Sequence, residues 1–296
     1  MTQFLELVIS GLSLGFVYAL IALGFVMIFK ATRVINFAHG SLLLIGAYVI
    51  ARLHDSLGFG GAVLVGVAGT ALLAALLHFV ILRRMRGAST DILTITTIGI
   101  DILLATELTR RIGTHVLTVG DPWHDDVVHL GGISIPEARV AAAVVAIIIL
   151  AAFLTAFKFT GWGIALRAAA EDSQAAALMG IRLGRVATGA WALSGALAAV
   201  AGVFFTSFPT PGVDAKVGLS ALSAFPAAIL GGLDSVVGAV VGGLVIGVVV
   251  SLTAGYQNDL SFLGRGLSDA APYIVMLLVL LVRPSGLFGT RELTRV

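Results

Sequence analysis

Long apolar runs, separated by short charged or glycine- and proline-containing breaks, recur along the whole of this 296-residue sequence. A helix needs about 20 apolar residues to cross the hydrocarbon core of a bilayer, and several of the runs reach that length. The chain is 58% hydrophobic and only 11% charged, whereas soluble domains are roughly 45–50% apolar and about 25% charged. These features predict an all-α, polytopic membrane protein and argue against a soluble enzyme.

The apolar runs predict about eight transmembrane helices within a single domain covering residues 1–296. Two further segments are short and broken, because residues 217–233 contain Pro226 and residues 270–282 contain Pro272. Interrupted segments of this kind are typical of discontinuous helices beside a transport pathway. A ninth crossing, or a re-entrant segment at 217–233, stays open. The long runs are 7–29, 34–51, 60–82, 92–108, 140–157, 187–208 and 236–254.

The basic residues are distributed unevenly among the breaks. Positively charged loops are retained on the cytoplasmic side of a membrane, so Arg83, Arg84 and Arg86 mark one loop as internal. Alternation from that loop places most of the 18 Lys and Arg residues inside, including those of 158–185 and of the tail from Arg283. The N-terminus is therefore expected outside and the C-terminus inside.

The internal segment that leads to Arg185 is longer than a connection between two spans needs to be. Residues 164–180 are rich in Ala and Leu, with polar breaks at Glu171 and Asp172, and Gly180 is a natural helix terminator. A short cytoplasmic helix is therefore predicted at about 164–180. A lipid-binding surface helix would carry a basic, aromatic-rich profile, which this segment lacks. Docking to another protein is favoured over lying on the membrane.

Several motifs resemble those of one transporter family. The Ala-Ala-Glu-Asp segment ending at Asp172, with three further alanines and Gly180, resembles the coupling motif of bacterial ABC importer permeases. An ordered set of other segments, from about residue 11 to residue 290, closely resembles the high-affinity branched-chain amino acid permeases. These are Leu-Gly-Phe-Val-Tyr-Ala-Leu-Ile-Ala-Leu-Gly at 14–24, Ile-Asn-Phe-Ala-His-Gly at 35–40, Gly-Ala-Tyr at 46–48, Ala-Ala-Ile-Leu-Gly-Gly at 227–232 and Gly-Ala at 238–239.

Two positions depart from the pattern of that family. Its members often carry an acidic residue after the Asn-Phe-Ala-His-Gly motif, where this chain has Ser41. A small or hydroxyl residue is more usual at the position of Asp101. The family includes permeases for urea, amides and other amino acids, and these solutes remain alternatives to branched-chain amino acids.

The resemblance implies a permease subunit of an ATP-driven ABC importer, located in the bacterial cytoplasmic (inner) membrane, that translocates branched-chain or related hydrophobic amino acids. It also implies the partners: two ATP-binding subunits, a second permease subunit that is identical or merely similar, a periplasmic or lipid-anchored substrate-binding protein, and the surrounding lipid. No Gly-x-x-x-x-Gly-Lys-Ser/Thr motif occurs in the chain, so ATP would be bound and hydrolysed by separate subunits. No cofactor is expected here. Glu171, Asp172 and Gly180 are the expected coupling residues.

Four polar residues within the expected spans are candidates for the substrate pathway, namely Asn36, His39, Thr97 and Asp101. Asn36 and His39 lie three apart and would share one face of a helix. Alternatively, Asn36 caps the helix start and His39 bonds to a carbonyl. An ionised Asp101 would cost at least ~2.5 kcal/mol in a bilayer, so it should face protein or water. It either shapes the pathway, or is protonated or hydrogen-bonded to a Ser or Thr of another helix.

Two other functional classes, a stand-alone transporter or channel and an intramembrane enzyme, fit this sequence less well. A stand-alone secondary transporter or channel would not need the internal docking helix. An intramembrane enzyme would need a nucleophile–base pair or a metal cluster within the spans, and no His-Glu-x-x-His motif is found, so no catalytic residue is expected. The His and Asp residues of the outer loop 110–137 match no standard metal spacing, and no metal site is expected. Without a block of like charges, no nucleic-acid partner is expected either.

Overall fold

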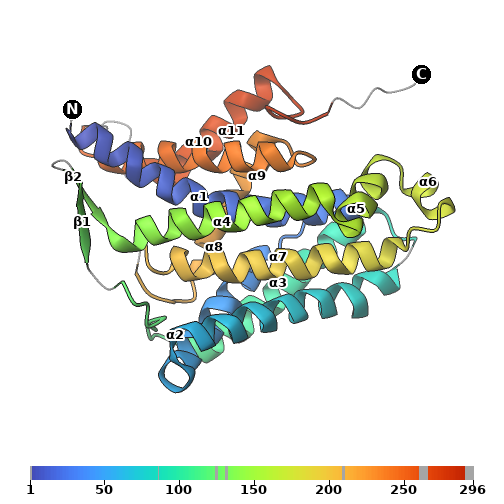
Figure 1. Cartoon of the computed structure of the whole chain (residues 1–296), viewed down its shortest axis with the longest axis horizontal. Helices are drawn as coiled ribbons and strands as arrows, with labels where there is room; N and C mark the ends of the chain where they lie inside the picture. The colour runs from blue at the N-terminus through green and yellow to red at the C-terminus, as the bar shows by residue number, and fades with distance from the viewer. Residues whose placement is uncertain are drawn as a thin grey trace.

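The computed structural model describes residues 2–85, 87–123, 126–130, 133–208, 211–259 and 266–290. Long helices lie side by side along the longest axis of the molecule (Figure 1). The helices are α1 (Thr2–Thr32), α2 (His39–Val80), η1 (Leu82–Met85), α3 (Thr90–Ile112), α4 (Glu137–Phe159), α5 (Gly161–Glu171), α6 (Ser173–Leu178), α7 (Leu183–Phe205), α8 (Val217–Ala221), η2 (Leu222–Ala224), α9 (Phe225–Gly231), α10 (Val236–Gly255) and α11 (Leu267–Val282). The fold is mostly helical, as expected, and it also contains one antiparallel hairpin of β1 (Val127–Leu130) and β2 (Ile133–Pro136).

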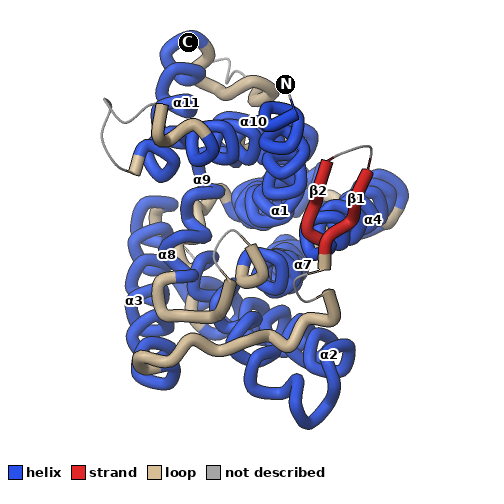
Figure 2. The backbone as a smooth tube through the Cα atoms, turned by 90° about the vertical axis from the view of Figure 1, so that its left-hand side faces the viewer, coloured by secondary structure: helices blue, strands red, loops and turns tan. Residues whose placement is uncertain are grey.

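Six helices in the described part of the chain are long and apolar enough to cross a membrane, namely α1, α2, α3, α4, α7 and α10. Helix α1 is the most enclosed of them, and Figure 2 shows it between α10 on one side and α7 on the other. It approaches α10 closely where Gly15 and Gly247 meet, because a Cβ on Gly247 would lie 2.3 Å from the Gly15 Cα. The structure therefore confirms a helical bundle with several spans, while the number of crossings and the orientation stay predictions.

Helix α2 consists of two antiparallel halves joined at Gly58, whose φ of 69° is outside the helical range. The halves pack tightly, since a Cβ on Gly66 would lie 2.5 Å from the Cγ1 of Ile50. Only glycine adopts such a φ at little cost, so Gly58 turns the chain with no longer loop. These halves correspond to the runs expected at 34–51 and 60–82.

The start of the first of these two runs was predicted wrongly. Helix α1 ends at Thr32, Arg33 has a φ of 58°, and α2 begins only at His39. Residues 33–38 are therefore a break in the helical structure, and it lies inside the bundle, because Val34, Asn36 and Ala38 have no exposed surface. The apolar character of this stretch reflects burial of an irregular segment.

The segment expected at 217–233 forms three short consecutive helical pieces, α8, η2 and α9. Just before it, Val213 pairs with Leu117, which follows the end of α3. Just after it, the Asp234 carbonyl accepts a hydrogen bond from Lys30 Nζ at the end of α1. The start of α3 shares a cavity with the end of α1, so the segment runs from one end of the bundle to the other.

Candidate functional site

The buried break between α1 and α2 gathers polar side chains from three helices. His39 has no exposed surface, and its Nδ1 lies 3.1 Å from the Ser194 Oγ on α7. Its ring lies against Gly24 of α1, where an added Cβ would be 2.4 Å from the His39 Cε1. The Phe25 ring also packs on His39, with centroids 4.6 Å apart. Gly24 thus makes the space in which His39 begins α2.

Asn36 stabilises the break itself. Its Oδ1 accepts a hydrogen bond of 3.1 Å from the backbone N–H of Ala38, which is the Asx turn that an Asn side chain forms with the backbone two residues on. The N-cap of α2 is Ala38, without a side-chain cap bond, so Asn36 does not cap the helix. Asn36 and His39 do not share a helical face, contrary to one of the two interpretations of the sequence, because Asn36 precedes the helix. Within the described residues, the Asn36 Nδ2 is buried and has no hydrogen-bond partner, whereas the buried His39 ring has the backbone of Ile21 as a hydrogen-bond partner. Unpaired buried atoms such as this Nδ2 are uncommon in folded proteins and mark places of functional interest.

Helix α3 holds the break and the start of α2 from one side. The Thr97 Oγ1 accepts a hydrogen bond from the Phe37 N–H at 3.1 Å, and it lies 3.1 Å from the Ile35 carbonyl oxygen. One turn further along α3, Asp101 accepts a hydrogen bond from the Ser41 hydroxyl at 2.5 Å. Thr97 is fully buried and Asp101 is partly exposed. The bond agrees with the interpretation of Asp101 as a partner of a Ser across a helix interface.

The two positions that depart from the resembled family are therefore each other's partners. The Ser41 hydroxyl on α2 faces the carboxyl group of Asp101 on α3. One carboxyl and one hydroxyl remain at the α2–α3 contact. The four candidate pathway residues thus surround the same break, with Thr97 and Asp101 on the α3 side and His39 turned toward α1 and α7.

The segment expected as one helix at 164–180 is two helices, α5 and α6, divided at Asp172. Asp172 is extended, with a φ of −146°, and its Oδ1 accepts hydrogen bonds of 2.9 Å from the N–H groups of Gln174 and Ala175. It is therefore the N-cap of α6, a role for which Asp is strongly preferred. Glu171, the last residue of α5, is exposed.

Gly180 ends α6 in the left-handed conformation, with a φ of 85°, in keeping with the helix terminator expected there. The N–H of Ile181 bonds to the Ala176 carbonyl at 3.0 Å, and the Gly180 N–H bonds to that of Ala177. The first bond is the 6→1 hydrogen bond of a Schellman motif. Glycine is favoured at its left-handed position because a residue with a Cβ would strain the backbone there. The path from α6 into α7 depends on this turn.

Helix α5 is attached to three of the long helices. Arg167 donates hydrogen bonds to the carbonyls of Phe157 and Lys158 at the end of α4. At the end of α1, Arg33 donates to the Ala170 carbonyl at 2.9 Å, and Trp162 lies against Gly189 of α7. Helix α6 projects beyond these contacts at one end of the molecule (Figure 1). Helix α5 therefore lies between α6 and the ends of α1, α4 and α7.

Some residues of this site could not be found from the sequence. Gly24 and Ser194 lie inside long apolar runs and carry no local signal that connects them to His39, since these contacts join distant segments. The break at Asp172 did carry a signal, because an Asp followed by Ser, Gln and alanines is a common helix start. The loop between α3 and α4, which the charge pattern predicts to be outside, is only partly described, and His124 and Asp125 lie outside the described residues.

Comparison with known proteins gives consistent matches along nearly the whole chain. Residues 7–282 match the family model of the permease component of branched-chain amino acid transport systems. The high-affinity branched-chain amino acid transport system permease protein LivH of Salmonella typhimurium is 32% identical over 309 residues, covering 99% of this chain and 98% of that protein. A probable branched-chain amino acid transport permease protein LivH of Methanocaldococcus jannaschii is 32% identical, covering 91% and 88%. BraD of Pseudomonas aeruginosa, a permease protein of the same kind of system, is 28% identical, covering 99% and 98%. No solved structure shows a significant match.

Proposed function

The chain belongs to the family of permease components of branched-chain amino acid transport systems, and from this premise we propose that it is the membrane subunit of an ATP-driven importer. It is a multi-pass membrane transport protein by family and by its apolar helices. In the proposal, two ATP-binding subunits power transport, a second permease subunit completes the membrane part, and an external binding protein delivers the amino acid. The location proposed for it is the bacterial inner membrane.

The observation that carries the ATP-driven part of this proposal is the α5–α6 segment. Leu178 and Met179 at the end of α6 are 89% and 84% exposed, although they lie outside the helices that are long enough to cross a membrane. Exposed apolar side chains on a short, well-capped helix are suited to insertion into a pocket of a partner protein. Glu171, at the junction of α5 and α6, can add a polar contact. A protein that transports without an ATPase has no need for such a projecting element.

The orientation proposed from the charges is supported by the grouping of basic residues. Lys30, Arg33, Arg83, Arg182 and Arg185 come from separate parts of the sequence, yet all lie at the end of the bundle that carries α5 and α6. Retention of positive charge on the cytoplasmic side favours this end as the internal one. The ATPases would then meet α6 in the cytoplasm.

The substrate pathway is proposed to pass along the break at residues 33–38. An amino acid is a zwitterion, and its two charges need polar groups within a bundle that is otherwise apolar. The Asn36 Nδ2 is a buried polar atom without a hydrogen-bond partner in the described residues, and the His39 ring is fully buried at the start of α2. Thr97 and Asp101 hold the surrounding backbone and the start of α2. Non-helical backbone at membrane depth is tolerated where it is buried or lines a pathway. Branched-chain amino acids are the proposed substrates because the relatives are described as their permeases.

The coupling role of α5–α6 is tested by copurification and by ATPase stimulation. The variants Glu171→Ala and Gly180→Val should reduce both the amount of copurified ATPase and the stimulation of ATP hydrolysis by loaded binding protein in reconstituted vesicles. Loss of a desolvated contact of this kind typically costs about 1–3 kcal/mol, or roughly five- to 150-fold in affinity. Glu137→Ala, an exposed carboxylate at the start of α4, is the matched control and should behave as wild type. Normal association and stimulation in both variants would make α5–α6 only a linker.

A further inference from the structure

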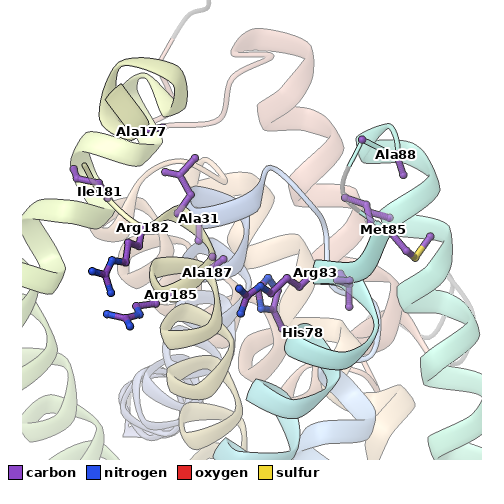
Figure 3. Close-up of a pocket in the computed structure, with 15 residues that line it drawn as sticks. Ala31, His78, Arg83, Met85, Ala88, Ala177, Ile181, Arg182, Arg185 and Ala187 are labelled. Carbon is purple, nitrogen blue, oxygen red and sulfur yellow. The ribbon is translucent and has the colours of Figure 1, made fainter. Parts of the chain in front are cut away.

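A cavity of ≈ 800 Å³ opens at the end of the bundle that carries α5 and α6 (Figure 3). The last turn of α1, the end of α2 with η1, and the first turn of α3 form one part of its wall. The turn between α6 and α7 and the start of α7 form the other part. The cavity is separate from the buried break described above, and none of the candidate pathway or coupling residues lines it.

The charge of this cavity is entirely positive. Arg182 and Arg185 come from the start of α7, and Arg83 comes from the opposite wall beside His78 (Figure 3). The residues that line the cavity include no Asp or Glu. Among the described residues, these three arginines form no ion pair, whereas Arg110 and Arg111 at the other end of α3 are both paired with Glu107. The cavity therefore presents uncompensated positive charge, which favours an anionic ligand.

An apolar surface leads directly to the rim of the cavity. Leu72, Leu76 and Phe79 lie on one face of the second half of α2 and are 70%, 51% and 52% exposed, and their spacing of four and three residues follows the helical repeat. The Arg83 guanidinium lies over the Phe79 ring, 4.9 Å from its centroid. A hydrocarbon chain along this face would place a polar group attached to its end beside Arg83. The combination of an apolar track and a basic cavity at the membrane boundary is a lipid-binding arrangement.

We propose that this cavity binds the phosphate-bearing headgroup of an anionic phospholipid, with Arg83, Arg182 and Arg185 as its ligands and an acyl chain along the exposed face of α2. Because it joins the end of α2 and the start of α3 to the start of α7, a bound headgroup would connect the walls on either side of the cavity. An acidic segment of a partner protein is the less favoured occupant, since it would use the arginines but not the adjoining apolar face of α2. The proposal does not depend on the importer function.

Native mass spectrometry of the purified chain in detergent tests this proposal, with phosphatidylglycerol as the probe and phosphatidylcholine as the uncharged reference. Wild type should retain phosphatidylglycerol selectively. Each arginine near a charged surface contributes roughly fivefold in affinity, so the triple variant Arg83→Gln/Arg182→Gln/Arg185→Gln should lose at least about tenfold of that selectivity. Arg182→Gln alone should lose less of this selectivity. Because Arg182 is exposed to solvent, this single variant should also fold normally.

Arg84→Gln is the matched control, because Arg84 is exposed and belongs to the same short helix as Arg83 but does not line the cavity. It should bind phosphatidylglycerol as wild type does. Equal lipid retention by the triple variant and wild type would overturn the proposal. Competition by millimolar inorganic phosphate as effective as that by the lipid would assign the cavity to a free anion and also overturn it. Normal lipid retention together with lost ATPase association would identify the arginines as protein contacts instead.

Discussion

The hydrogen bond between Asp101 and Ser41 can be measured directly with a double-mutant cycle. The variants are Asp101→Ala, Ser41→Ala and the combination, compared with wild type by reversible unfolding in detergent. Ser41 is 3% exposed and the Oγ–Oδ1 distance is 2.5 Å, which argues for a strong bond. Hydrogen bonds between helices in membrane proteins average about 0.6 kcal/mol with a maximum near 1.7, while bonds to charged groups reach roughly 1.5–3 kcal/mol. Because Asp101 is partly exposed, we expect a coupling of about 1–2 kcal/mol.

A reciprocal variant extends the same test. Ser41→Asp/Asp101→Ser keeps one carboxyl and one hydroxyl at the α2–α3 contact, so it should be more stable than either single exchange and should retain more transport. The stability effects of substitutions at distant, independent sites add to within about 0.3–0.5 kcal/mol. If the double alanine variant were additive within that limit, and the reciprocal variant no better than the single ones, Asp101 and Ser41 would not form the pair on which this account of α3 relies.

Three further predictions concern packing, capping and orientation. Gly24→Ala places a Cβ 2.4 Å from the His39 Cε1 and should destabilise the protein by about 1–3 kcal/mol in thermal unfolding. Gly99→Ala is the control and should not destabilise it, because nothing lies within 4 Å of the added Cβ. Equal effects of the two variants would refute the close fit of His39. Asp172→Ala removes the cap of α6 and should lower the local stability of this helix by about 0.5–2 kcal/mol. The expected result is faster hydrogen exchange over 173–178, and unchanged exchange there would contradict the capping role. The chain has no native cysteine, so single cysteines can be labelled specifically with an impermeant thiol reagent in intact spheroplasts. Ser173→Cys, predicted inside, should resist the reagent, while Ser56→Cys, near the turn of α2, should react. The opposite pattern would invert the proposed orientation.

The parts of the fold that depend on local periodicity could be predicted well from the sequence. The apolar runs gave the positions of the long helices, because each span must satisfy its own backbone hydrogen bonds and present apolar side chains. The turn at Gly58 fell between two of the expected runs. The first run nevertheless included residues 34–38, which are buried but not helical. Hydropathy reports burial, and it cannot distinguish a buried helix from a buried break.

The candidate site was predictable only in part, because its contacts join distant segments. Asn36, His39, Thr97 and Asp101 stood out as polar residues in apolar runs, and the structure gathers all four around one break. Their partners Gly24, Ser41 and Ser194 are small residues whose roles appear only when α1, α2, α3 and α7 are packed. In the α5–α6 segment, helix propensity predicted continuity through Asp172, and local capping prevailed instead.

The most direct test of the central proposal is uptake of radiolabelled leucine, isoleucine or valine into reconstituted vesicles. The components are this chain, its partner permease, the cognate ATPases and the binding protein, with ATP supplied on the side of the ATPases. Uptake should require ATP and every component, and it should fall with Glu171→Ala while ligand capture by the binding protein stays normal. Uptake of the same amino acids by this chain alone, without ATPases or ATP, would contradict the proposal and identify a stand-alone transporter.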